Sequence, residues 1–105
     1  MRRRLFDHPA VWRPLNEGEM LTLRTIRYAP CIGVEKVCKD LGEKFGYYRG
    51  YSCIAGNINA LVACKIVDET RLTKQSNHWI LQYSITELGA RVVNDAVERV
   101  KGAKR

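Results

Sequence analysis

Residues 52–89 read SCIAGNINALVACKIVDETRLTKQSNHWILQYSITELG, and this stretch decides the fold because its hydrophobic period changes twice. Apolar residues recur at helical spacing over about residues 53–63, which predicts a helix with a serine at its N-terminal cap. The apolar residues of 66–70 and the alternation over 79–85 are typical of two strands, and the polar residues between them predict a turn. A threonine then caps a last helix, which we expect over residues 87–101.

Two more helices are indicated upstream of this stretch. Asn16 and Glu19 have the spacing of a capping box, so a first helix begins after Asn16, and it ends before Pro30. The apolar spacing within residues 34–45 predicts a second helix that stops at Gly46. The order of elements is therefore three helices, two strands and a helix, which predicts an α+β, mostly α fold.

The 105 residues suffice for one domain with one modest core. Residues 1–14 lack a helical period and contain two prolines, so we expect a basic N-terminal arm there. The domain is expected over residues 15–101, followed by a tail at residues 102–105.

Three helices followed by a two-stranded hairpin is the order of a winged helix-turn-helix, and three stretches resemble MarR-like and PadR-like regulators. Residues 15–23 (LNEGEMLTL) are similar to their opening helix, and residues 59–69 (NALVACKIVDE) to the end of their recognition helix. Residues 83–89 (YSITELG) are similar to the segment after their wing. The resemblance, which covers about residues 15–100, implies a three-helix core, a β-hairpin wing and an additional C-terminal helix. It also implies a small regulator, of phage or mobile-element type, that binds double-stranded DNA.

The sequence departs from this pattern at three places. The link between the second and third helices, from Leu41 to Ser52, is longer than is usual in these families. Lys65 stands where such families usually carry glycine, at the turn from helix into strand. Residues 50–64 contain no charged residue, whereas a recognition helix usually carries Arg, Lys or Gln to reach base edges.

The net charge of +7 lies at the two ends of the chain. Residues 1–13 carry +3, residues 14–70 carry none and residues 71–105 carry +4. A basic surplus in separate segments suggests a polyanionic partner, nucleic acid first. No apolar run approaches the ~20 residues of a membrane-spanning helix, and no signal peptide is evident, so we expect a cytoplasmic protein without a membrane partner.

The third helix and its N-terminal end supply the first candidate DNA-binding residues. Asn57 and Asn59 each offer a donor and an acceptor, which suits the major-groove edge of adenine. Arg49, Tyr51 and Ser52 precede or begin this helix, where backbone N–H groups and the helix dipole favour phosphate.

The hairpin and the arm supply the remaining candidates. A wing tip commonly touches phosphate or probes the minor groove, and an arginine arm can enter a narrow minor groove. The predicted wing residues are Arg71, Lys74, Gln75, Asn77 and His78, with the turn at residues 74–77, and the arm residues are Arg2, Arg3 and Arg4.

A homodimer is expected, because one uncharged recognition helix binds weakly and a symmetric pair doubles the contacts. The last helix has an apolar stripe broad enough to leave an edge for a second subunit. The predicted interface consists of Phe6 and Trp12 in the arm and Val93, Val97 and Val100 in the last helix. The dimer would act as a repressor or recruiter of polymerase by occupying an operator.

Two other functions stay open at this point. The uncharged third helix, with Tyr47, Tyr48 and Tyr51 beside it, also suits a protein-interaction module. The four cysteines, Cys31, Cys38, Cys53 and Cys64, suit a thiol-based redox or metal sensor, although no zinc spacing is present and buried apolar roles are favoured. The sequence contains no G-x-S-x-G, H-E-x-x-H or G-x-G-x-x-G motif and no glycine loop for phosphate, so we expect no enzyme, no cofactor and no metal.

Overall fold

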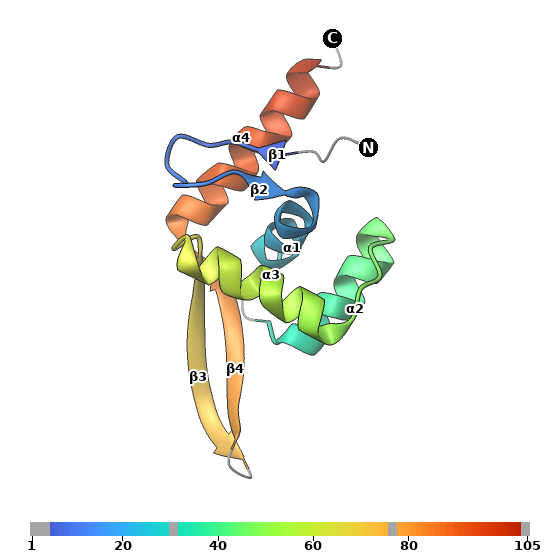
Figure 1. The fold of residues 1–105 in the computed structure, drawn as a ribbon, viewed down its shortest axis with the longest axis vertical. Coiled ribbons are helices and arrows are strands. Elements are labelled where there is room, and N and C mark those ends of the chain that lie inside the picture. The colour runs from blue at the N-terminus through green and yellow to red at the C-terminus, as the bar shows by residue number, and fades with distance from the viewer. Residues whose placement is uncertain (1–4, 30–31, 76–77, 104–105) are drawn as a thin grey trace.

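Helix α1 lies between the other helices and contacts each of them in the computed structural model, which describes residues 5–29, 32–75 and 78–103. The elements in chain order are β1 (Leu5–Phe6), β2 (Leu15–Asn16), α1 (Glu17–Arg27), α2 (Val34–Phe45), α3 (Tyr51–Ala63), β3 (Val67–Gln75), β4 (His78–Ile85) and α4 (Glu87–Ala103). The molecule is elongated, 52 × 26 × 22 Å, with α4 and the β3–β4 hairpin at opposite ends (Figure 1). The predicted order of three helices, two strands and a helix is confirmed from α1 to α4, whereas the short strands β1 and β2 were not predicted.

The start of α1 is the predicted capping box. The Glu19 N–H donates to Asn16 Oδ1 over 2.8 Å, and the Asn16 N–H donates to Glu19 Oε1 over 3.0 Å. The Arg13 guanidinium donates to both Glu19 carboxylate oxygens, over 3.1 and 2.5 Å. Burial disfavours the charged carboxylate, but the bonds from Arg13 and from the Asn16 backbone outweigh it and lower the pKa of Glu19.

The described part of the expected arm, residues 5–14, is folded back on the domain. β1 pairs antiparallel with β2, and Val11 is buried in the core. His8 Nε2 lies 2.6 Å from Asp95 Oδ2 on α4, while His8 Nδ1 accepts the Ala10 N–H. The N-terminal segment is therefore tied to α4, across most of the chain length.

Glycines mark the end of α2 and the start of α3. Gly46 ends α2 in the left-handed conformation (φ +63°), as predicted. The prediction that Ser52 caps α3 is wrong. The N-cap is Gly50, whose carbonyl oxygen accepts the N–H groups of Cys53 and Ile54, so the helix has already begun when the chain reaches Ser52.

The β3–β4 hairpin is longer than the sequence indicated. Lys74 and Gln75, expected in the turn, belong to β3, and Gln75 pairs with His78 of β4. Residues 76–77 connect the strands and lie outside the described residues. The register shifts between Arg71 and Thr73, as at a β-bulge.

Helix α4 joins the hairpin through the segment that resembles known regulators. Thr86 caps α4, because its hydroxyl accepts the Gly89 N–H (3.0 Å) and donates to the Lys65 carbonyl (3.0 Å). The Thr86 N–H donates to the Ile66 carbonyl over 3.2 Å. Lys65 adopts a left-handed conformation (φ 62°), which explains why glycine is usual at this place.

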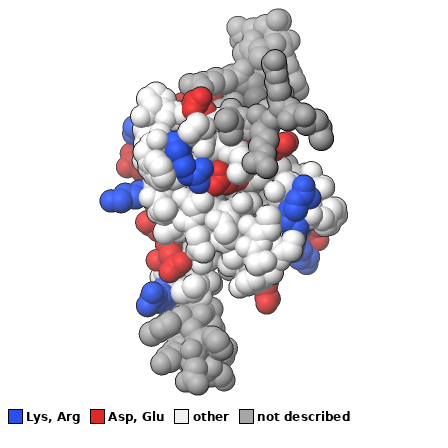
Figure 2. All heavy atoms as spheres, in the orientation of Figure 1, with Lys and Arg blue, Asp and Glu red and all other residues white. Residues whose placement is uncertain are grey.

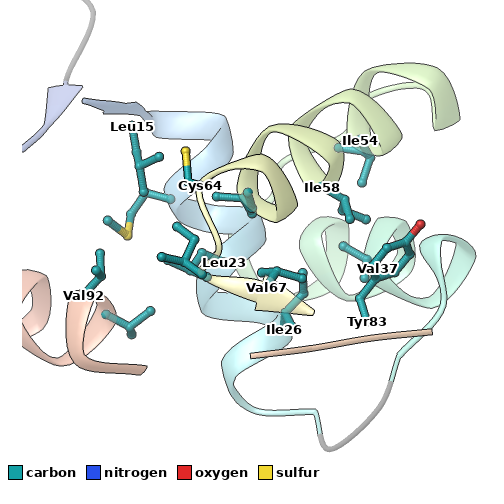
Figure 3. Close-up of a cluster of buried hydrophobic side chains, with 14 of the residues drawn as sticks. Leu15, Leu23, Ile26, Val37, Ile54, Ile58, Cys64, Val67, Tyr83 and Val92 are labelled. Atoms are coloured by element: carbon teal, nitrogen blue, oxygen red, sulfur yellow. The ribbon is translucent and has the colours of Figure 1, made fainter. Parts of the chain in front are cut away.

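One core connects all the layers (Figure 3). It contains Leu23 and Ile26 of α1, and the chain between α1 and α2 adds a short bridge from Ile32 to Tyr83 of β4. The other fully or nearly buried apolar residues are Leu15, Met20, Val37, Leu41, Ile54, Ile58, Leu61, Cys64, Ile66, Val67, Val92 and Val93. α3 is therefore held rigidly, because its inner side chains are part of this core.

Candidate nucleic-acid interface

Helix α3 has one buried face and one exposed face. Ile54, Ile58 and Leu61 are 0% exposed and fix the inner face against α1 and α2. The residues exposed to solvent on the opposite side are Ser52, Cys53, Gly56, Asn59 and Ala63. The surface over α3 is mostly free of charge, with charged side chains of both signs at its margins (Figures 1 and 2). We call these five residues the outward face of α3.

The two asparagines of α3 differ in their surroundings. Asn59 is exposed on the outward face. Asn57 is half-buried, and its Nδ2 lies 3.5 Å from Thr22 Oγ1 on α1, to which it donates. A base edge approaching the outward face therefore meets the Asn59 amide, while the Asn57 amide is turned to α1.

Arg49 is held against an aromatic ring beside the N-terminal end of α3. Its Cζ lies 4.4 Å from the centre of the Tyr47 ring, and its Nη1 donates to the Tyr48 carbonyl over 2.8 Å. The guanidinium remains exposed, and α3 begins two residues later. Stacking on a ring restricts the long side chain without removing its charge from solvent.

Tyr47, which supports Arg49, was predicted only for the protein-interaction alternative and not as a DNA-binding residue. Its hydroxyl lies against Gly18 of α1, where an added Cβ would collide with it. Tyr48 lies on Gly42 of α2 in the same way. A glycine inside each of two helices, where it weakens the helix, was the sequence signal for these close approaches.

The N-terminal end of α3 is open to solvent. Tyr51 is 59% exposed and Ser52 is also exposed. The first N–H groups of a helix have no intrahelical partner, and here no side chain caps them. Together with Arg49 they form an electropositive end on a helix that carries no charge itself.

The predicted wing residues lie along the hairpin. Arg71 of β3 is exposed and pairs with Leu81. Lys74, Gln75 and His78 are paired strand residues. Asn77 and the three arm residues Arg2, Arg3 and Arg4 lie outside the described residues.

Known structures share the fold of this chain. The hsRosR complex superposes with a TM-score of 0.73 at 19% identity, covering 85% of this chain and 75% of that one. A PadR family transcription regulator from Clostridium difficile gives a TM-score of 0.70 at 10% identity, covering 83% of this chain and 90% of that one. Bacillus subtilis PadR in complex with operator DNA gives a TM-score of 0.65 at 14% identity, covering 75% of this chain and 45% of that one.

The chain has a winged helix-turn-helix fold. The predicted likeness to regulators of this superfamily is confirmed at the level of the fold, with the β3–β4 hairpin as the wing. No family model matches the sequence, and no curated protein matches it.

The predicted dimer residues occupy three different environments in the winged helix. Trp12 is 73% exposed, with the Arg13 guanidinium 5.8 Å from its ring centre, and Phe6 is half-buried against the core. Val93 needs a correction, because it is only 1% exposed and packs inside its own chain, leaving no side-chain surface for a partner. Val97 and Val100 belong to α4.

The three described cysteines differ in their exposure to solvent. Cys38 is half-buried, Cys53 is exposed on α3 and Cys64 is buried, and Cys31 lies outside the described residues. Burial raises the pKa of the Cys38 thiol. Within residues 5–29, 32–75 and 78–103, no three His, Cys, Asp or Glu residues gather as metal ligands. The same residues include no helix with the length and apolarity needed to cross a membrane.

Proposed function

We propose that this protein binds double-stranded DNA at specific sequences, with α3 in the major groove and the wing beside it. The observation that carries the proposal is the presentation of α3. Its inner residues are fully buried and its outward face is exposed and uncharged, with Arg49 two residues before the helix and Lys65 two residues after it. This arrangement suits a helix that enters a groove between two phosphate backbones. Bacillus subtilis PadR, which shares the fold, was solved with operator DNA.

Each candidate residue has a role that follows from its place. The Asn59 amide pairs with adenine, and Arg49 neutralises a phosphate with help from the N–H groups of Tyr51 and Ser52. Asn57 holds α3 on α1 through Thr22 instead of contacting a base. The wing residues Arg71, Lys74, Gln75, Asn77 and His78, and the arm residues Arg2, Arg3 and Arg4, contact phosphate or the minor groove.

We further propose a cytoplasmic homodimer that regulates transcription by occupying an operator. Trp12 is available to this assembly, since its ring is 73% exposed and aromatic residues are enriched at protein interfaces. The interface would join Phe6 and Trp12 to Val97 and Val100 of α4. A two-fold dimer would place two α3 helices in successive major grooves of a palindromic site.

The test is selection from a random double-stranded DNA pool, followed by anisotropy titration of the selected and a scrambled duplex at two salt concentrations. We expect a palindromic motif bound far more tightly than the scrambled duplex. Asn59→Ala should reduce that preference, whereas the control Asn94→Ala, at an exposed position on α4, should not. The absence of any enriched motif would contradict the proposal.

A protein-interaction module is the second candidate, favoured by Tyr48 and Tyr51 at 73% and 59% exposure beside the uncharged face. The two functions respond differently to salt. DNA affinity falls steeply as salt rises, whereas binding of a protein to this neutral surface should change little.

A further inference from the structure

We infer that α3 selects A·T base pairs, reading adenine through Asn59 and thymine through its methyl group. The inference rests on the proposed function and adds to it the class of base pair that the helix accepts. Its basis is the chemistry of the outward face together with the placement of the nearest cations.

The outward face carries none of the charged groups that usually read G·C pairs, and its hydroxyl, on Ser52, can bond to either kind of pair. Guanine is usually recognised by Arg or Lys, which donate to its two acceptors, and cytosine by the carboxylate of Asp or Glu. None of these residue types occurs over residues 50–64. The one exposed side chain of α3 that offers both a donor and an acceptor in a planar amide is Asn59, and that pattern matches adenine.

The remainder of the outward face is small and mainly apolar. Ala63 presents a methyl group, Cys53 presents a thiol, and Gly56 presents only its Cα. The thymine methyl is the one apolar group on the major-groove edges, so it is the base feature that this surface complements. An added Cβ on Gly56 would meet nothing within 4 Å in this chain, so the backbone there is open to a close approach.

The cations stand beside the face instead of on it. Arg49 is fixed against Tyr47 before α3 begins, and after α3 ends Lys65 is exposed in the turn and Arg71 on the wing. At these places they are suited to phosphates, and the centre of α3 is left to the bases. Because the cations lie off the outward face, α3 offers guanine no Arg or Lys donor, while the positive charges that attract the DNA backbone remain near the helix.

The experiment uses the full chain and the duplex selected above. Footprinting of the selected duplex identifies the base pairs that α3 covers. We expect these to be A·T pairs. Replacing each of those thymines by deoxyuridine, which removes only the methyl group, should weaken binding about fourfold per buried methyl. Thymines outside the α3 positions are the matched control and should tolerate the same replacement.

Gly56→Ala gives a second, independent measurement. The variant should fold at least as stably as the parent, yet bind the selected duplex several-fold more weakly, because the new methyl occupies the space of close approach. G·C pairs at the α3 positions, or indifference to every deoxyuridine, would overturn this inference while leaving the DNA-binding function intact. A pool with no enriched sequence would instead overturn the proposed function, and the inference with it.

Discussion

Gly89 is the position at which a single methyl group tests how α4 packs on the domain. A Cβ built on Gly89 would lie 2.7 Å from Ile85 Cγ1 and 3.0 Å from the Ile66 carbonyl carbon, with the Ile66 oxygen closer still. Carbon atoms prefer separations of about 3.5–4.0 Å, so α4 must move away by roughly 1 Å. That movement also strains the bond from the Gly89 N–H to the Thr86 hydroxyl.

The expected cost of Gly89→Ala follows from two opposing effects. Overpacking costs typically 1–3 kcal/mol, and the upper end applies here because a backbone carbonyl is the obstacle. Alanine recovers about 1 kcal/mol of helix propensity relative to glycine. The net loss is therefore about 2 kcal/mol, which corresponds to a decrease in Tm of roughly 10 °C for a domain of this size.

Gly56→Ala is the matched control, since it makes the same chemical change within a helix. Its Cβ enters open space, so the full propensity gain of about 1 kcal/mol should appear as added stability. Urea and thermal unfolding, followed by far-UV circular dichroism, measure both variants against the parent. If Gly89→Ala were as stable as Gly56→Ala, α4 would not approach Ile66 as described, and the explanation of the Thr86–Gly89 segment would fail.

Four other changes have definite expected outcomes. Lys65→Gly should raise the free energy of unfolding in urea by up to about 1 kcal/mol, because relief of the left-handed backbone strain exceeds the added entropy of the unfolded chain. A lower free energy of unfolding would show that the lysine side chain itself stabilises the fold. Burial and the nearby Glu69 carboxylate raise the pKa of Tyr83 from 10.0 to about 12, so stability should decline as pH rises through this interval, and Tyr83→Phe should lessen the decline. An ultraviolet titration in which all tyrosines ionise together would contradict this. Glu19→Gln should lose about 1–2 kcal/mol at neutral pH. Since the pKa of Glu19 is lowered below 4.5, this difference should shrink as pH falls under that value, and a difference independent of pH would refute the assignment. Arg49→Ala should flatten the salt dependence of DNA binding by about 0.9 in logarithmic slope. Tyr47→Ala should flatten this salt dependence less, and it should add nothing in the Arg49→Ala background. Additive effects would show that Tyr47 does not act through Arg49.

The sequence predicted those parts of the fold that local chemistry decides. Asn16 with Glu19, Gly46 and Thr86 each set a helix boundary through bonds or dihedral angles within a few residues. The N-terminal segment could not be predicted in this way. Its two-residue strands have no measurable period, and its bond from His8 to Asp95 joins residues far apart in the chain.

The candidate site was predictable by element but not by residue. Asn57 and Asn59 are the same residue type on the same helix, and only the packing of α3 on α1 turns one amide to Thr22 and the other to solvent. Val93 on α4 was mispredicted for a similar reason. An apolar stripe indicates that a helix face is buried, but it does not say whether the same chain or a second copy buries it. Exposure is a property of the assembled fold, so a sequence pattern leaves it undetermined.

Residues 50–64 carry no charge, unlike the usual recognition helix. The cations outside α3 explain how DNA could still be bound. Affinity from counterion release needs positive charge near phosphates, and Arg49 and Arg71 can supply it without lying on α3. Base selection needs only short-range complementarity, which a neutral helix provides in any salt concentration. The two contributions then reside on different residues. Removal of a flanking arginine should weaken selected and scrambled duplexes alike, while a change on the outward face alters the preference between them.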